Sequence, residues 1–479
     1  MRTKIFIIIM TGLLTVSCAD LLEENPKSIA VETFYNTPDE VGAALNAIYP
    51  CFNGLDVMGY YWALDESSSD MVYGRGSYGI LSTYVGLDVT NTTRIQGVWS
   101  ATYRAIRNAN ICIQEIPEGA KLTEEQKKTF LGEAHFMRAF SYLMLVKHWG
   151  GVPLRTEENM SELSVPRSPA SKIWDLILQD LLFARDNLTD SPRLEGAPTI
   201  GSANALLTEV YLWLGKTGDA LTSAKTLIKS GKFSLVEISA ADDFDSKLFG
   251  VNVAASPEKV FYLKYSRLIQ GNAILPLAHH ASSPYLNGFG WMGQFTDSTN
   301  PIIRDWDKAD LRYEYNWYTN KNAPGPTALL NKKFQDKEAT NNGGSNDMPY
   351  YRYAEILLWF AEAEAKINGV TEEAVDALNQ VRRRAYGKPS KVASDIDFKT
   401  TDFANAEAFI NRVILEYGYE TVFEGKRWGY LRRLGIAAQQ ISAVKGLNVQ
   451  EKHYLWPIVI NETNYNSAID PIKDQNPGY

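Results

Sequence analysis

The chain has 479 residues, of which 45% are hydrophobic and 22% are charged, a balance typical of a well-buried globular protein. This length suggests two or three domains, or one large body built from repeats. The 48 Lys and Arg residues are outnumbered by 56 Asp and Glu residues, so the net charge is −8. Because nucleic-acid-binding proteins need basic patches, this charge argues against that class of function.

The first 17 residues have the pattern of a bacterial lipoprotein signal peptide. Arg2 and Lys4 are basic, and residues 5–16 form an apolar stretch too short to anchor a mature protein across a bilayer. Cys18 follows a small residue at the end of that stretch, which looks like a lipobox. We therefore expect a mature chain that begins at Cys18 and is acylated there, with several acyl chains giving stable membrane attachment. The alternative is an ordinary signal peptide followed by a chance cysteine.

Residues 18–36 read as a polar tether between the lipid and the folded body, which we expect to occupy residues 37–479. Removal of residues 1–17 leaves 46 positive and 56 negative charges, a net of −10. Thr37 followed by Pro38 predicts the start of the first helix of the body.

The stretch Phe130–Trp149 predicts a helix of about five turns at the centre of the fold. Residues 143–146 are all apolar and point in four successive directions around the axis, so the helix must be covered on several sides. Gly150 and Pro153 end it. The segment 168–188 is its natural partner, with Ser168 as the expected N-cap.

Further helix pairs resemble tetratricopeptide (TPR) repeats, with small residues where neighbouring helices touch. The predicted helices are 203–215 with 218–230, and 353–368 with 372–384. Because one such pair cannot bury both faces, we expect helix pairs at about 98–235 and 350–386 to stack into a curved solenoid. The predicted fold class is therefore mainly all-α.

Two long segments lack the helical pattern, at about 54–97 and 236–349. Long irregular segments in a compact body tend to be functional, and we expect these two to bind ligand. The segment Gly74–Gly79 formally matches GxGxxG, but no apolar strand precedes it, which excludes a dinucleotide site. Residues 387–479 are expected to form a loop-rich packing segment that includes helices near 405–423 and 426–434.

Two cysteines, Cys51 and Cys112, remain besides Cys18. They would pair in an oxidising compartment if they lay close together. Their apolar helical surroundings are more typical of unpaired core cysteines. The sequence leaves both possibilities open.

The order of several motifs resembles the SusD/RagB family of outer-membrane lipoproteins along nearly the whole mature chain. The matching segments are VWSATYRAIRNANICI (98–113), FLGEAHFMRAFSYLMLVKHWGGVPL (130–154), YRYAEILLWFAEAEAKING (351–369), ALNQVRRRA (377–385), FEGKRWGYLRR (423–433), LWPI (455–458) and QNPGY (475–479), together with Cys18. The resemblance implies a TPR-containing helical body on the outer leaflet. It also implies a partner, a SusC-type TonB-dependent transporter, to which the protein presents oligosaccharides or, in some members, peptides.

The sequence departs from the family pattern at two places. Gly429 stands where the family usually has Asp, two residues after Arg427. Tyr417 follows Glu416 where the family usually has Arg. Both positions lie in packing motifs, so they leave the expected fold and role unchanged.

Sugar binding needs an aromatic ring for the apolar face of the sugar and polar groups for its hydroxyl rim. The segment 54–97 offers both, and its candidate ligand-binding residues are Tyr61, Trp62, Asp65 and Tyr78. The segment 236–349 offers a second set, namely Tyr285, Trp291 and Trp317. Large aromatic residues in loops often mark recognition sites, although any one of them can instead pin its loop to the helices.

Catalysis has weaker support. Asp65, Glu66 and Asp70 are candidates for the carboxylate pair of a glycosidase, but their spacing is equally typical of a turn. His279 and His280 lack neighbours at metal-ligand spacing, so we expect no metal and no cofactor. The leading hypothesis is a binding protein without chemistry of its own. The rivals are a surface glycan hydrolase on a helical scaffold and a TPR scaffold that binds no small ligand.

Overall fold

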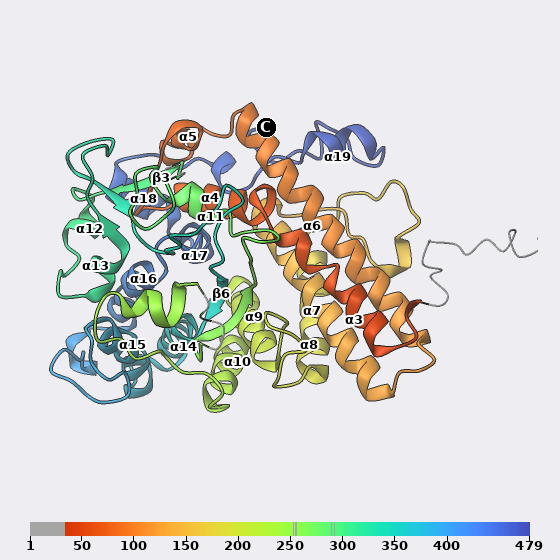
Figure 1. The fold of residues 1–479 in the computed structure, drawn as a ribbon, viewed down its shortest axis with the longest axis horizontal. Coiled ribbons are helices and arrows are strands. Elements are labelled where there is room, and N and C mark those ends of the chain that lie inside the picture. The colour runs from red at the N-terminus through yellow and green to blue at the C-terminus, as the bar shows by residue number, and fades with distance from the viewer. Residues whose placement is uncertain (1–33, 252, 254–255, 289, 292) are drawn as a thin grey trace, which may run out of the picture.

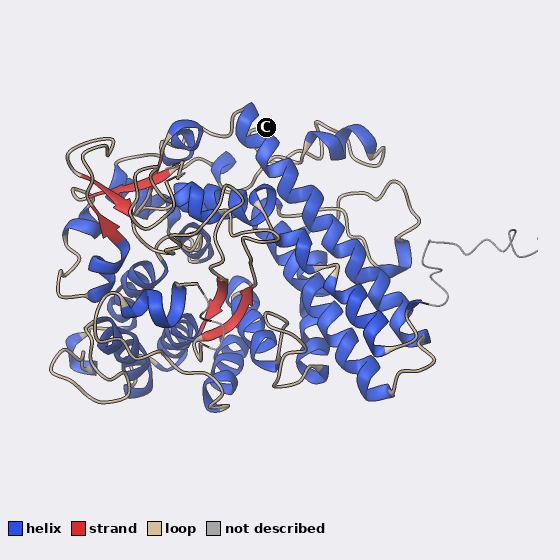
Figure 2. Cartoon of the chain, viewed as in Figure 1, coloured by secondary structure: helices blue, strands red, loops and turns tan. Residues whose placement is uncertain are grey.

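The computed structural model describes residues 34–251, 253, 256–288, 290–291 and 293–479, and Cys18 and the signal peptide lie outside this range. Helices form most of the described chain, and the few strands are short (Figure 2). The predicted mainly all-α fold class is confirmed. None of the described helices is long and apolar enough to cross a membrane.

The helices and strands are labelled in Figure 1. The α-helices are α3 (Pro38–Asn46), α4 (Tyr60–Ser67), α5 (Gly79–Ser82), α6 (Val89–Glu115), α7 (Glu124–Trp149), α8 (Ala170–Asn187), α9 (Ile200–Trp213), α10 (Thr217–Lys229), α11 (Ile274–Ala278), α12 (Pro301–Arg304), α13 (Leu311–Asn316), α14 (Tyr353–Asn368), α15 (Glu372–Ala385), α16 (Ala406–Thr421), α17 (Arg427–Arg433), α18 (Ala437–Lys445) and α19 (Ile460–Tyr465). The strands are β1 (Tyr73–Gly74), β2 (Lys259–Leu263), β3 (Gln294–Asp297), β4 (Trp317–Tyr318), β5 (Ala328–Asn331) and β6 (Met348–Arg352).

The central helix α7 is buried on almost every side, as its apolar pattern predicts. It begins at Glu124, six residues before the predicted start, because Thr123 and Gln126 form a capping box there. It ends at Trp149, and Gly150 follows with φ of 70°, a value that favours glycine. Helices α6 and α8 pack against it on two sides (Figure 1). The helix is therefore the inner member of the stack.

The stack continues through α8, α9 and α10, each packed against the one before it. Helix α10 then packs against α14, although more than 120 residues separate them in the sequence. Ala220 and Ala224 of α10 are fully buried, as expected for small residues between close helices. This arrangement is compatible with a TPR-like solenoid. The segment between α10 and α14 is a long insertion into one continuous stack of helices.

Several boundaries differ from the predictions for local reasons. Helix α6 begins nine residues earlier than predicted, because Asp88 accepts a hydrogen bond from the backbone N–H of Asn91 and caps it. Helix α8 begins at Ala170, so Pro169 and not Ser168 is its N-cap. The predicted loop-rich C-terminal segment also contains α18 and α19.

The segment 54–97 is not irregular throughout. Residues 60–67 form helix α4, most of which is buried. The short strand β1 in the same segment pairs with β3, and the sheet order is β1-β3-β5-β4. A second sheet joins β2 to β6 in antiparallel register. These pairings hold the two long segments against each other and against the helices.

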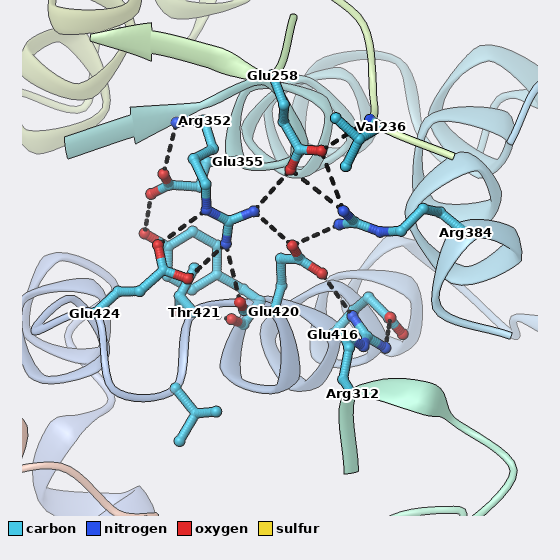
Figure 3. Close-up of polar contacts among 12 residues, drawn as sticks. Val236, Glu258, Arg312, Arg352, Glu355, Arg384, Glu416, Glu420, Thr421 and Glu424 are labelled. Atoms are coloured by element: carbon cyan, nitrogen blue, oxygen red, sulfur yellow. Dashed lines mark hydrogen bonds and ion pairs between the residues drawn. The ribbon is translucent and has the colours of Figure 1, made fainter. Parts of the chain in front are cut away.

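A buried network of ion pairs joins the long segment 236–349 to the helices (Figure 3). Arg352, which is fully buried, lies at its centre. Its guanidinium group donates to Glu258 at 2.8 Å, to Glu420 at 2.6 Å and to Glu424 at 2.6 Å. Because Glu258 precedes β2 while Glu420 belongs to α16, this one side chain ties three parts of the chain together.

Two further arginines extend the network. Arg384 of α15 donates to Glu258 at 3.1 Å and to Glu420 at 2.6 Å. Arg312 of α13 donates to the other oxygen of Glu420 at 2.9 Å. Removing one partner of a buried ion pair typically costs about 3–5 kcal/mol, because the other charge stays buried without compensation.

Cys51 and Cys112 are both buried and free, so the alternative of unpaired core cysteines is correct. The thiol of Cys51 donates to the carbonyl oxygen of Ala47 at 3.7 Å. Burial raises the pKa of Cys112 to about 12, which keeps this thiol protonated.

The network makes stability fall in acid. Burial alone would raise the pKa of Glu424, but Arg352 and Lys333 outweigh burial and lower the pKa to about 2 from 4.5. Arg433 likewise holds the pKa of the buried Glu362 at about 2. A carboxylate with a depressed pKa stabilises the fold above pH 4.5, and this contribution is lost as the pH falls from 4.5 towards 2. Urea denaturation at a series of pH values should show the loss in that window.

The Glu424→Gln variant is the control for this prediction. It should be less stable than the wild type at pH 7, and its stability should depend less on pH below 4.5. Equal pH dependence in the two proteins would show that Glu424 does not contribute to the acid transition.

Candidate functional site

Three of the four candidate residues of the first segment lie inside the protein on helix α4. Tyr61, Trp62 and Asp65 are 3%, 1% and 2% exposed. The indole N–H of Trp62 donates to the carbonyl oxygen of Phe423 at 3.0 Å, and a Cβ on Gly425 would lie only 2.7 Å from the indole ring. The ring therefore fills a tight slot beside the C-terminal segment. The ring is not accessible from the surface, so ligand contact by Trp62 stays a prediction without support from its position.

The acidic residues of the same segment are also buried and bonded. Asp65 lies 2.8 Å from Nε2 of His148. Glu66 accepts hydrogen bonds from the backbone N–H groups of Phe423 at 3.0 Å and Gly425 at 2.8 Å. Asp65 holds α4 against α7, Glu66 holds it against the residues that follow α16, and they present no exposed pair for acid–base chemistry.

The pKa shifts of Glu66 and Asp70 agree with a structural role for these buried carboxylates. Burial raises the pKa of Glu66 to about 7, although its two backbone hydrogen bonds act in the opposite direction. Asp70 is different, because Arg427 binds both of its oxygens at 2.9 and 2.7 Å. Burial would raise the pKa of Asp70, but Arg427 outweighs burial and lowers it.

Trp317 and Trp306 of the second segment are buried as well. Trp317 is 6% exposed, and its ring meets Phe423 edge to face with 5.3 Å between ring centres. Trp306 stacks on Tyr419 of α16 with ring centres 4.1 Å apart. Trp306 therefore pins its loop to α16, and Trp317 of β4 packs against Phe423.

Trp291 is the candidate that lies on the surface, with 51% of the residue exposed. Two described backbone N–H groups, those of Trp291 and Gly293, are hydrogen bonded to α11. The N–H of Trp291 donates to the carbonyl oxygen of Pro276 at 2.6 Å, and the N–H of Gly293 donates to that of Leu277 at 2.7 Å. A Cβ at Gly290 would lie 2.2 Å from the carbonyl oxygen of His279, so only glycine allows this close approach. The exposed ring thus belongs to a residue whose own backbone N–H is bonded to α11.

The structure brings the two predicted segments together at Trp291. The backbone N–H of Arg75 donates to the carbonyl oxygen of Gly293 at 2.7 Å. Arg75 is exposed, and its bonding partner Gly293 comes two residues after Trp291 in the sequence. Tyr78 lies beneath, since its ring atoms are 3.2 Å from where a Cβ of Gly293 would stand. Arg94 of α6 covers the Tyr78 ring at 4.0 Å. Tyr78 is 5% exposed and supports the surface from below.

Further polar groups lie on the loop that precedes β3 and on the segment that follows β4. His280 accepts a hydrogen bond from the N–H of Ser282, and Asn320 donates to the Ser282 hydroxyl at 2.9 Å. Burial and the nearby charge of Arg75 lower the pKa of His280, which favours the neutral ring at pH 7. The half-buried Tyr285 meets Tyr318 edge to face at 5.3 Å.

We call this set of residues the Trp291 surface. It comprises Arg75, His280, Ser282, Tyr285, Trp291 and Asn320. The set contains an exposed indole, a cation, hydroxyl and amide groups, the combination that a sugar ring requires. Sequence reasoning singled out Trp291 and Tyr285, but it missed Ser282 and Asn320, because common polar loop residues carry no sequence signal of their own.

No metal centre is formed by the described residues, among which no group of three or more His, Cys, Asp or Glu side chains stands at ligand distance. His279 is fully buried and hydrogen bonds through Nε2 to the carbonyl oxygens of Lys333 and Phe334. Burial lowers its pKa to about 4. His279 is therefore a core residue that fixes the loop under Trp291.

Comparison with known proteins agrees with the helical stack and its inserted segments. Residues 296–479 match the sequence model of the SusD family, and residues 21–212 match a second model described as "Starch-binding associating with outer membrane". The chain belongs to the SusD/RagB family. The SusD-like protein P2 of Formosa agariphila is 26% identical over 99% of this chain and 99% of its own length.

Solved structures of SusD-like proteins share the fold. A SusD homologue from Bacteroides thetaiotaomicron superposes with a TM-score of 0.79 and 22% identity, covering 94% of this chain and 98% of that one. Surface glycan-binding protein A from Bacteroides fluxus superposes with a TM-score of 0.74 and 20% identity, covering 92% of this chain and all of that one. At these identities the likeness establishes the SusD fold for this chain.

The positions of the tryptophans predict opposite effects of truncation. Trp291→Ala should weaken oligosaccharide binding by tenfold or more, about 1.4 kcal/mol, and leave the melting temperature unchanged, because the ring is exposed. Trp62→Ala should lower the melting temperature strongly, since truncation of a core Trp typically costs about 3–5 kcal/mol. Thermal melting and calorimetric titration of both variants test the assignment. If Trp291→Ala binds like the wild type, the Trp291 surface is not the ligand site.

Proposed function

We propose that this SusD-family protein is a cell-surface lipoprotein that captures oligosaccharides and delivers them to a SusC-type TonB-dependent transporter in the outer membrane. The observation that carries the proposal is the exposed Trp291, whose backbone is hydrogen bonded to α11 and whose segment pairs with the backbone of Arg75. An indole that a protein fixes in an exposed position offers a flat apolar platform. The polar groups around it suit a hydroxylated ligand better than a purely apolar one.

The rival function as a glycan hydrolase has little support from the geometry. Its candidate carboxylates, Asp65, Glu66 and Asp70, are buried and hydrogen bonded to neighbouring segments. A glycosidase needs two carboxyl groups that reach the scissile bond from opposite sides. We therefore propose binding without hydrolysis.

The rival function as a scaffold without a small ligand draws support from the buried Trp62, Trp306 and Trp317. The exposed Trp291 argues against the scaffold function, because a scaffold that binds no small ligand does not need an indole on its surface. Binding measurements on the Trp291 surface decide between the two functions.

A glycan array with the soluble body, residues 19–479, tests the proposal directly. We expect binding to a defined class of oligosaccharide, loss of that binding in Trp291→Ala, and no new reducing ends after prolonged incubation. New reducing ends from the wild type would instead establish a hydrolase. Absence of binding to every glycan and peptide on the array would favour the scaffold.

Attachment at the outer membrane is tested at Cys18. Cys18→Ala should abolish incorporation of a labelled fatty acid and release the protein from the outer-membrane fraction, because the acyl chains carry the attachment. Co-purification of the wild-type protein with a TonB-dependent transporter, analysed by mass spectrometry, tests the partner. A Cys18→Ala variant that is still labelled and membrane-bound would contradict lipidation at this residue.

A further inference from the structure

Helix α6 carries a stripe of residues that the proposed site does not use. Trp99, Tyr103, Ile106 and Asn110 follow one another at spacings of four, three and four, so they share one face of the helix. This face forms one wall of a groove of about 480 Å³, within the range of about 300–1,000 Å³ typical of ligand pockets. The residues that we assign to the Trp291 surface are absent from its lining.

The opposite wall of the groove is fixed by Arg155. The backbone oxygen of Arg155 accepts hydrogen bonds from Asn110 at 3.1 Å and from the Tyr142 hydroxyl at 2.8 Å. Its guanidinium group donates to the carbonyl oxygens of Glu162 at 2.8 Å and Leu163 at 3.2 Å. Both ends of this arginine are thus held in place before any ligand arrives, which reduces the entropic cost of binding.

Helix α19 closes the third side. Its Glu462 accepts a hydrogen bond from the indole N–H of Trp99 at 3.3 Å, and its neighbour Asn466 donates to the carbonyl oxygen of Val165 at 2.7 Å. Tyr465 lines the groove, yet 84% of the residue is exposed. In Figure 1, α19 lies beside one end of α6. A large ring left this exposed at the mouth of a built groove is typical of a recognition site.

The groove has an excess of positive charge, although the whole chain has a net charge of −8. Arg104 and Arg107 of α6 line it together with Arg155, and Glu462 is the acidic residue of the lining. Arg104 and Arg107 are exposed, and neither forms an ion pair in the part of the chain that the structure describes. Guanidinium groups bind carboxylate and sulfate oxygens in a two-pronged manner, which ammonium groups do not match.

We propose that the groove between α6, Arg155 and α19 is a second binding site that takes an anionic oligosaccharide, one that carries uronic-acid carboxylates or sulfate esters. Tyr103 and Tyr465 offer ring surface to the sugar, and the three arginines bind its charged groups. The assignment to a sugar rather than an acidic peptide rests on the proposed function. We expect this site to give the protein a higher affinity for charged glycans than for neutral ones.

Calorimetric titration of the soluble body tests the proposal with tetragalacturonate and a heparin-derived tetrasaccharide as anionic probes and maltotetraose as the neutral one. The double variant Arg104→Gln/Arg107→Gln should lose tenfold or more in affinity for the anionic probes and keep the wild-type melting temperature. Affinity for these probes should also fall with added salt, because exposed charges are screened. The Arg104→Lys/Arg107→Lys variant should recover only part of the affinity.

Matched controls separate this site from general charge and from the Trp291 surface. Lys128→Gln/Lys391→Gln removes two exposed positive charges that also lack an ion pair among the described residues, and it should change affinity less than twofold. The groove and the Trp291 surface should also bind independently, so Trp291→Ala should leave the affinity of the groove for the anionic probes unchanged. Anionic probes that bind no better than maltotetraose, or an equal loss in the lysine control, would overturn the proposal. A hexaglutamate peptide that competes as well as tetragalacturonate would overturn the assignment to a sugar.

Discussion

The fold depends on the charges buried around Arg352. A guanidinium group with no exposed surface is costly to bury, and here Glu258 from before β2 and Glu420 and Glu424 from the end of α16 and just after it compensate it. Apolar packing alone would let the long segment 236–349 slide over the helices, because hydrophobic contacts are not directional. Charged hydrogen bonds have fixed lengths and angles, so they hold the segment in one register.

The position of segment 236–349 on the helices determines where the Trp291 surface lies. The loop that carries Trp291 follows α11, and its backbone pairs with Arg75 from the other long segment. Underneath, the buried carboxylate of Glu66 and the indole of Trp62 fasten α4 to the backbone at Phe423. Trp62, one of the predicted ligand contacts, is therefore packed in the interior, while Trp291, another of them, is exposed.

The two proposed sites use aromatic rings and arginines in different surroundings. At the Trp291 surface a single exposed indole is accompanied by hydroxyl and amide groups, which suits neutral sugar hydroxyls. In the groove beside α6, Arg104, Arg107 and Arg155 dominate, which suits carboxylates or sulfates. A protein with both sites would hold a long glycan at two points, and linked weak contacts bind far more tightly together than either does alone.

The sequence by itself determined the helical class, the inner position of α7, the use of small residues where helices touch, and the family, because these follow from local periodicity and motif order. Only the tertiary structure decided which tryptophans are buried. Trp62 and Trp291 both stand in glycine- and tyrosine-rich segments, and nothing local distinguishes them. Their environments are set by Phe423 and Gly425, more than 350 residues after Trp62, and by the pairing of Gly293 with Arg75. Burial depends on such distant contacts, and one stretch of sequence cannot encode them.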